Sequence, residues 1–396
     1  MSDFDEMLGD LRSAGLFRSL SVVEPIDGGH VRLGTREVVS FAGNDYLGLR
    51  RHPSVVAAAK AALDLYGAGA GASRLLAGNV PVHQELESAL AAFAGRDRAL
   101  VFPSGYQTNV GVLTTLAGDG DVLFLDSLCH ASLIDGARLS KAQFRVYPHG
   151  DTVRLDKALG RRTGGGRRVV VTEGVFSMDG DLAPLAEISR LVERHGAWLV
   201  LDDAHAFGVL GKGGRGLAEH LGVVLPERSV FVATLSKALG SQGGFAAGSV
   251  EVVDLLVNCA RSFIYTTGLS PGSAAAALEA LKLLGEPSRR ERLLELSGRA
   301  RTMLRGVIPS VPAGVTPIIP VVVGEVSCAV KLSAQLLEAG IFAPPIRPPT
   351  VPRGTARLRI SLSADHTEQD IEKLCGALRE GLARCGFSLD RPSAET

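Results

Sequence analysis

Residues 197–205 read Ala-Trp-Leu-Val-Leu-Asp-Asp-Ala-His, an apolar run of strand length that ends in two acids and a histidine. Similar runs recur through the middle of the chain, and helical patterns alternate with them. The runs are Ala99–Phe102, Asp121–Leu125, Arg168–Thr172, Ala197–Asp203 and Val230–Leu235, and the helical patterns cover 104–117, 131–140, 183–195 and 250–258. This alternation predicts βαβ units and an α/β fold with a mostly parallel central sheet. Because the runs are apolar throughout, both faces of the sheet should be covered.

The chain divides into three predicted regions. Residues 1–45 form an N-terminal segment that begins with a short amphipathic pattern and then becomes irregular. Residues 46–287 form the large domain, whose last helix (271–285) stops at Gly285-Glu286-Pro287. Residues 288–396 form a small C-terminal α/β domain, predicted as helix 289–306, strand 317–323, helix 327–339, Pro-rich loop 344–352, strand 356–362 and helix 367–385.

Composition excludes several classes of protein. The 42 basic and 42 acidic residues balance among 396, so neither nucleic acid nor a membrane surface is an expected partner, and local groups must hold any anionic ligand. Five cysteines without CxxC spacing favour free thiols over disulfides or zinc. With no leader pattern and no apolar run of membrane length, a cytoplasmic protein is expected.

Ligands of an open parallel sheet bind at the carboxyl ends of its strands, so the residues that follow each run are site candidates. Ser104-Gly105-Tyr106 opens a helix whose free N–H groups suit a phosphate, although an ordinary turn would look alike. Asp202 and His205 could belong to a metal site or to a solvated loop, but no other ligands of metal spacing lie nearby. Lys237 ends a buried run before a Gly-rich loop, where it is either a desolvated nucleophile or a surface lysine.

Together these features resemble the fold-type I pyridoxal-phosphate (PLP) enzymes, and among them the α-oxoamine synthase family. The resemblance covers nearly the whole chain and implies an aminotransferase-like fold with a large PLP domain. The motifs that carry it, in chain order, are Asn44-Asp45-Tyr46-Leu47-Gly48, Ser104-Gly105-Tyr106, His130-Ala131-Ser132, Glu173-Gly174-Val175-Phe176-Ser177-Met178-Asp179-Gly180, Asp202-Asp203-Ala204-His205 and Thr234-Leu235-Ser236-Lys237. The sequence departs from the family pattern at Cys129 and at Ala206-Phe207, so the resemblance does not predict the exact lining of the pocket.

The resemblance implies roles for the catalytic residues. Lys237 would be the Schiff-base lysine and the general base, and Asp202 would bond the protonated pyridine nitrogen of PLP. His205 would bond the phenolic oxygen, and His130 would stack on the ring. The remaining residues expected to bind the cofactor are Ser104, Gly105, Tyr106, Ser177, Thr234 and Thr267, the last donated by the partner subunit of a homodimer.

The family condenses an amino acid with an acyl thioester and releases CO₂. The run from Ile346 to Arg359 most resembles the biotin-pathway branch, which implies L-alanine with pimeloyl-CoA or pimeloyl carrier protein. Asn44 would bind substrate. Arg359 would bind the carboxylate of the amino acid, unless it is only a charge on a strand. Arg347 and Arg18 are candidates for the far carboxylate of the acyl chain, but Arg347 could instead brace the Pro-rich loop by bonding carbonyls.

Rival functions differ in class. Another α-oxoamine synthase, such as glycine C-acetyltransferase or serine palmitoyltransferase, would share the chemistry but use other substrates. A non-catalytic regulatory subunit would lack Lys237. A nucleotide-dependent oxidoreductase would need a GxGxxG turn after a strand, and the nearest approach, Gly67–Ala72, follows no predicted strand, so a substrate-side loop is expected there.

Overall fold

The computed structural model describes residues 3–161 and 165–385, which fold as two compact units. Unit 1 consists of Met1–Tyr46, Met178–Gly180 and Glu291–Thr396, as far as these ranges are described, and unit 2 of Leu47–Ser177 and Asp181–Arg290. The sequence-based boundaries, 45/46 and 287/288, lie close to the chain positions 46/47 and 290/291 where the unit changes. The N-terminal segment shares a unit with the C-terminal part of the chain.

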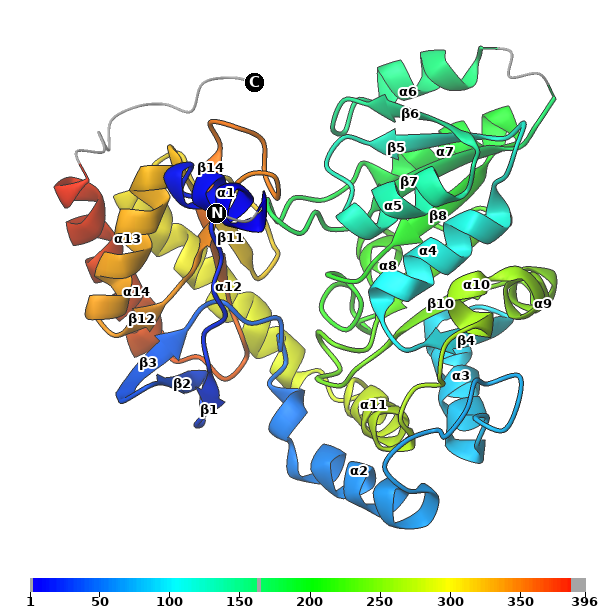
Figure 1. The fold of residues 1–396 in the computed structure, drawn as a ribbon, viewed down its shortest axis with the longest axis horizontal. Coiled ribbons are helices and arrows are strands. Elements are labelled where there is room, and N and C mark those ends of the chain that lie inside the picture. The colour runs from blue at the N-terminus through cyan, green and yellow to red at the C-terminus, as the bar shows by residue number, and fades with distance from the viewer. Residues whose placement is uncertain (1–2, 162–164, 386–396) are drawn as a thin grey trace. The chain divides into compact units, whose positions relative to one another are not determined.

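Unit 2 is built on a sheet of seven strands among the described residues (Figure 1). In spatial order they are β4 (Arg98–Phe102), β10 (Gly244–Gly248), β9 (Ser229–Thr234), β8 (Trp198–Asp202), β7 (Arg168–Glu173), β5 (Val122–Asp126) and β6 (Gln143–Tyr147). All are parallel except β10, which is antiparallel to both of its neighbours. The predicted fold class and mostly parallel sheet are therefore confirmed.

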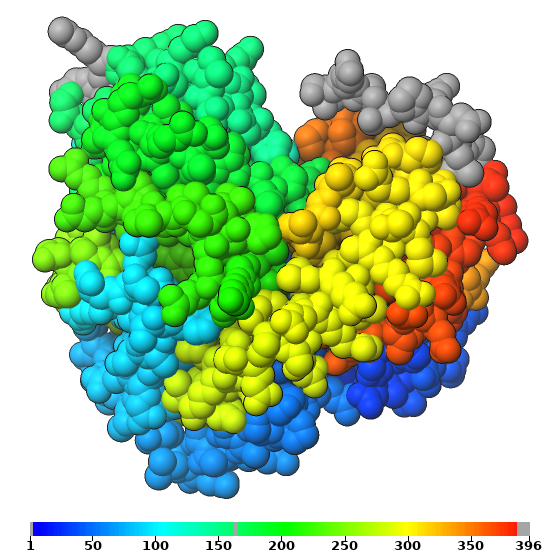
Figure 2. Space-filling model, turned by 180° about the vertical axis from the view of Figure 1, so that it is seen from behind, coloured from blue at the N-terminus to red at the C-terminus, as the bar shows by residue number. Residues whose placement is uncertain are grey.

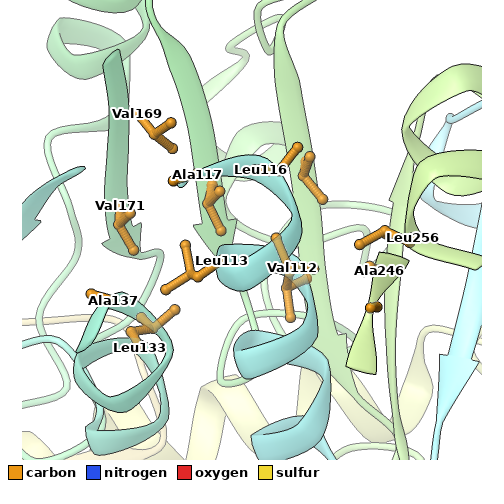
Figure 3. Close-up of a cluster of buried hydrophobic side chains, with 14 of the residues drawn as sticks. Val112, Leu113, Leu116, Ala117, Leu133, Ala137, Val169, Val171, Ala246 and Leu256 are labelled. Atoms are coloured by element: carbon orange, nitrogen blue, oxygen red, sulfur yellow. The ribbon is translucent and has the colours of Figure 1, made fainter. Parts of the chain in front are cut away.

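Helices surround this sheet. They are α2 (Pro53–Tyr66), α3 (Pro81–Ala94), α4 (Gly105–Leu116), α5 (Ala131–Leu139), α6 (Thr152–Leu159), α7 (Leu185–His195), α8 (Leu217–Leu221), α9 (Val250–Cys259), α10 (Arg261–Ile264) and α11 (Pro271–Leu283), with the 3-10 turn η1 (Leu49–Arg51). Figure 3 shows how the core forms: Leu113 of α4 points toward Leu133 and Ala137 of α5, beside Val171 of β7. Burial of such aliphatic faces on both sides of the sheet is the main stabilising term of this unit.

Unit 1 holds two small sheets. One has the order β1 (Glu24–Pro25), β2 (His30–Leu33), β3 (Arg36–Ser40) and β12 (Ile341–Phe342), and the other has β11 (Ile318–Gly324), β14 (Ala356–Ser361) and β13 (Pro345–Ile346). Its helices are α1 (Asp3–Ser13), most of α12 (Ser288–Val307), α13 (Val326–Glu338) and α14 (Glu368–Arg384). Figure 2 shows α12 (yellow) beside α14 (red), where Arg299 pairs with Glu368 and Glu372.

Some details of the sequence-based fold were wrong or missing, among them the N-terminal hairpin, the edge strand β6 and the strand β10. Residues up to 45 are not irregular, because β2 and β3 form a hairpin that β12 extends from far along the chain. The Gly-rich loop after Lys237 leads directly into β10, which was not predicted because Gly-Phe-Ala-Ala-Gly lacks the β-branched residues typical of strands. The turn between β9 and β10 is too short for the helical crossover that parallel pairing requires, so β10 runs antiparallel.

No helix of the described ranges is long and apolar enough to cross a membrane. Nor do the side chains described in either unit bring three or more His, Cys, Asp or Glu residues together as a metal site would.

Candidate active site

The cofactor-site residues predicted within this chain gather at one edge of the unit 2 sheet. Ser104 follows β4, His130 follows β5, Ser177 follows β7, Asp202 ends β8, and Lys237 lies three residues beyond β9. These strands are parallel, so their carboxyl ends share an edge. The charges of Asp202 and Lys237 both act on the pKa of His130, as expected for neighbours in one site.

Asp202 is held by donors on both carboxylate oxygens. The side-chain amide of Asn109 donates to Oδ2 at 2.6 Å, and the backbone N–H of Ala204 donates to Oδ1 at 3.1 Å. The same Asn109 nitrogen donates to Ser132 Oγ at 2.9 Å. Asp202 is 7% exposed, so its charge lies in a poorly solvated place where it can act strongly on a bound cation.

Lys237 contacts a histidine. Its Nζ lies 2.9 Å from Nε2 of His205, which is buried. Because an ammonium group has no lone pair, this contact requires Nε2 to accept while Lys237 is protonated, or to donate once the amine is neutral. The potential nucleophile therefore lies beside an imidazole that can hydrogen-bond to the amine in either of its protonation states.

The ring of His130 is held by Ser132. Its Nδ1 accepts from the backbone N–H of Ser132 at 3.2 Å and lies 2.8 Å from Ser132 Oγ. Burial lowers the pKa of His130, and the nearby Lys237 lowers it further against the opposing charge of Asp202. The neutral ring then carries its proton on Nε2, which leaves that atom as the donor.

Two further carboxyl groups are buried beside Asp202. Burial, followed by the charge of Asp202, raises the pKa of Glu173 to about 8. Glu173 accepts the backbone N–H of His130 at 2.6 Å. Burial likewise raises the pKa of Asp203 to about 7, although the N–H of Leu217 donates to Oδ2 at 2.9 Å. Asp203 Oδ1 is buried without a hydrogen-bond partner among the described residues.

The predicted phosphate cradle consists of the Ser104–Tyr106 turn, with Thr234 near the phosphate. Ser104 caps α4 by accepting the N–H of Gln107 at 3.2 Å, and the first turn of α4 offers N–H groups and a positive dipole end. A Cβ on Gly105 would lie 3.5 Å from Thr234, whose Oγ1 lies 2.7 Å from Ser236 Oγ. The helix start therefore lies next to the hydroxyls at the end of β9.

Tyr106 and Thr267 lie at the surface of the described chain. Tyr106 is 48% exposed and donates its hydroxyl to Asp135 at 2.6 Å. Thr267 is exposed, whereas its neighbour Thr266 accepts from Gln107 at 3.3 Å. The contacts that these two residues make with a cofactor therefore stay predictions.

The predicted substrate residues all lie in unit 1. Arg359 is buried on β14 and donates to Asn44 Oδ1 and to the Tyr46 hydroxyl, each at 3.1 Å. Tyr46 also donates to Asn44 at 3.3 Å, and burial raises its pKa. These partners are neutral and hold the guanidinium in a defined plane. Asn44 and Arg359, predicted separately, thus form one cluster.

Arg347 bonds backbone carbonyls. It donates to the carbonyl oxygens of Gly15 and Phe17, the latter at 3.4 Å, and so braces the N-terminal segment rather than the Pro-rich loop itself. Arg18, next in the chain to Phe17, is exposed. A role for either arginine in binding an acyl carboxylate stays a prediction.

The donor set of unit 2 fits the PLP that the family resemblance implies. Asp202 suits a protonated ring nitrogen, Lys237 an aldehyde carbon, and the start of α4 a phosphate dianion. Asn109 Oδ1 is buried and has no partner among the described residues, so the group that orients Asp202 keeps a free acceptor in the site.

Comparison with known proteins decides the family. Residues 36–378 match the family model described as aminotransferase class I and II. The chain belongs to this family. It is 47% identical to 8-amino-7-oxononanoate synthase of Nitrosomonas europaea, covering 97% of this chain and 100% of the relative. It is 46% identical to the Geobacter sulfurreducens protein of the same name, covering 96% and 97%.

Solved structures agree with this placement. Serine palmitoyltransferase of Sphingomonas wittichii superposes with a TM-score of 0.90 at 33% identity, covering 97% of this chain and 98% of the other. The S. paucimobilis serine palmitoyltransferase with a bound PLP–myriocin aldimine gives a TM-score of 0.91 at 30% identity, with the same coverage. The predicted resemblance to fold-type I enzymes and α-oxoamine synthases is confirmed.

Sequence reasoning missed three residues that shape this site: Asn109, Ser132 and Glu173. Asn109 lies four residues after Gly105, on the same face of α4, so helical spacing could have placed it at the strand ends. Ser132 and Glu173 belong to motifs used for the resemblance, but no role was assigned to them. The signal for Glu173 was an acid at the end of an otherwise apolar strand.

Proposed function

We propose that this protein is an 8-amino-7-oxononanoate synthase with PLP as its cofactor. It would join L-alanine to a pimeloyl thioester, of coenzyme A or of a carrier protein, and release the free thiol and CO₂. The observation that carries this proposal is identity of 43–49% with relatives of that name over nearly the full chain. We further propose that it acts in the cytoplasm, which the free-thiol pattern of the sequence favours.

The cofactor chemistry requires a fixed anion and a fixed amine. PLP, when bound, supplies an electron sink for carbanionic chemistry at the amino-acid α-carbon. The Asp202 carboxylate would keep the ring nitrogen protonated, and Asn109 would keep that carboxylate in place at 2.6 Å. The start of α4 and the Thr234 hydroxyl would hold the phosphate group.

Lys237 would move the proton. After the amino acid has displaced it, its amine would remove the proton from the α-carbon of alanine and later return one to the product. His205, 2.9 Å from Nζ, would orient the amine toward that carbon. His130, kept neutral by burial, would cover the ring and could donate from Nε2 to the thioester oxygen or to the substrate carboxylate.

Binding of the two substrates would depend on unit 1. Arg359 would pair with the α-carboxylate of alanine, because a guanidinium is always charged and matches a carboxylate with two hydrogen bonds. Its bonds to Asn44 and Tyr46 already fix its plane, which lowers the entropic cost of binding. Arg347 or Arg18 would meet the far carboxylate of the pimeloyl chain.

We also propose a homodimer in which each site receives Thr267 from the partner subunit. The exposure of Thr267 and of its neighbour Tyr265, which is 71% exposed, supports a surface that another chain covers. Light scattering on the active protein tests the assembly, and an active monomer would rule it out. A two-fold axis would make both sites equivalent.

The reaction is tested by incubating the PLP-loaded protein with a panel of amino acids and a panel of acyl-CoAs. The product is then identified by mass spectrometry. Alanine with pimeloyl-CoA should give 8-amino-7-oxononanoate. The alternative is serine palmitoyltransferase activity, which the structural likeness to the Sphingomonas enzymes favours. A shared fold does not select substrates, so preference for serine with a long acyl-CoA would replace the proposal.

A further inference from the structure

His149 lies between two carboxylates at the edge of the unit 2 sheet. It follows β6, with Nδ1 2.9 Å from Asp126 Oδ1 and Nε2 2.7 Å from Asp181 Oδ2. Asp126 ends β5 and is almost fully buried, whereas Asp181 lies in the segment after β7 and is 41% exposed. Three strand-end segments therefore meet at one imidazole ring.

The geometry requires a charged ring. A carboxylate only accepts, so both ring nitrogens must carry protons for both contacts to be hydrogen bonds. Burial by itself would lower the pKa of His149, but the bonds to Asp126 and Asp181 outweigh it and raise the pKa to about 10. Two charge-assisted hydrogen bonds, which are stronger than neutral ones, thus join β5 to the segment after β7.

The segment after β7 is a hairpin that carries Ser177. Val175 pairs with Leu182, and the N–H of Phe176 donates to the carbonyl of Asp181 at 3.1 Å. The His149 ring meets the ring of Phe176 edge to face, with centroids 4.3 Å apart. His149 therefore contacts both arms of the hairpin, one through Phe176 and the other through Asp181.

The other side of the contact leads to His130. Asp126 Oδ1 also accepts the N–H of Leu128 at 2.9 Å, and Oδ2 accepts the N–H of Gly150 at 2.9 Å. Asp126 thereby shapes the turn that runs from β5 to His130. The hairpin with Ser177 and the turn before His130 are thus linked through a single side chain.

We propose that His149 is a positioning residue of the cofactor site, whose imidazolium clamps the Ser177 hairpin to the turn that carries His130. The inference rests on the cofactor site of the proposed function, but not on which amino acid or thioester reacts.

The test replaces the cation with a neutral amide, His149→Gln, in the full-length protein. Glutamine cannot donate to both carboxylates from the position of the ring, so the hairpin should open more often. Amide hydrogen exchange at residues 174–177 and 181–183 of the cofactor-free protein should rise about tenfold, as loss of one hydrogen bond to a charged group predicts. PLP should bind about tenfold more weakly, with an altered visible circular dichroism, on the same reasoning.

The matched control is His195→Gln. His195, at the end of α7, also pairs with a carboxylate, Nε2 to Asp156 at 2.7 Å, but it lies at the amino ends of the strands. Exchange in the hairpin and PLP binding should stay within about twofold of wild type in this control, as expected for a distant site. An equal increase in both variants would mean general destabilisation and would overturn the proposal.

Asp181→Ala provides a second variant that removes the clamp from the hairpin side. Its partly exposed position should tolerate alanine, so it decides the matter if His149→Gln does not fold. It should raise hairpin exchange and change the dichroism of bound PLP as His149→Gln does. Unchanged hairpin exchange and dichroism would refute the clamp. Neither readout uses alanine or a thioester, so the test of the clamp can succeed even if the proposed reaction is wrong.

Discussion

Glu173 should carry a proton in the folded protein at neutral pH, and Glu173→Gln should reveal it. The side chain is 3% exposed and ends β7, where it accepts the N–H of His130 at 2.6 Å. Burial, then the charge of Asp202, raises its pKa from 4.5 to about 8. Glutamine has nearly the same shape as glutamate but cannot titrate, so the variant removes the pH dependence that this position gives to stability. Any hydrogen bond that the variant also loses changes stability equally at every pH.

The magnitude follows from linkage. Between about pH 4.5 and about pH 8 the unfolded chain has lost the Glu173 proton while the folded protein keeps it, so the free energy of unfolding falls as pH rises. The slope is about 1.4 kcal/mol per pH unit for one whole proton. From about pH 5 to about pH 8 wild type should therefore lose about 3 kcal/mol that Glu173→Gln keeps.

The assay is urea unfolding of the cofactor-free protein at about pH 5 and about pH 8, with wild type and Glu173→Gln compared at each pH. The free energy of unfolding of Glu173→Gln minus that of wild type should be about 3 kcal/mol larger at the higher pH than at the lower pH. Infrared spectra at neutral pH should also show a protonated carboxyl C=O band in wild type that the variant lacks. If the stability difference is the same at both pH values, Glu173 is ionised throughout and the reasoning fails.

Other predictions concern the proposed roles directly. Lys237→Ala should abolish turnover and leave no cofactor link that borohydride can trap, and a trapped link on another lysine would refute the assignment. Asp202→Asn should lower kcat by a factor of about a hundred or more, as loss of a main electrostatic partner does, although its amide can still bond Asn109; wild-type activity would contradict it. Arg347→Ala should raise KM for pimeloyl-CoA more than for an uncharged acyl-CoA of equal length. Equal increases would mean that Arg347 only braces the carbonyls of Gly15 and Phe17.

Sequence patterns predicted the parallel core well because its strands are buried on both faces. A strand such as β8 needs an unbroken apolar run, and that requirement is visible in one sequence. Residues placed at the end of such runs, Asp202 among them, therefore also fell at one edge of the sheet. The acids and the lysine were noticeable because charged residues rarely follow buried strands without a reason.

Elements that depend on partners distant in sequence were not predicted. β3 pairs with β12, about 300 residues later, and β10 takes its strand form from β4 and β9 on either side. The same applies within the site. Asn109 becomes important only because α4 lies over the end of β8, and the Asp126–His149–Asp181 contact joins three separate loops. No spacing along the chain encodes such contacts.

The hydrogen-bond donors distinguish Asp202 from the two other buried carboxyl groups of this site. Asp202 receives Asn109 and Ala204, one on each oxygen. Asp203 receives the N–H of Leu217 on Oδ2, its Oδ1 has no hydrogen-bond partner among the described residues, and burial raises its pKa to about 7. Glu173, with its pKa near 8, stays largely protonated at neutral pH. Three adjacent carboxyl groups therefore need not carry three charges, which would repel one another in a poorly solvated site. Asp202, the one of the three with a donor on each oxygen, is the carboxyl group that we propose to pair with the ring nitrogen.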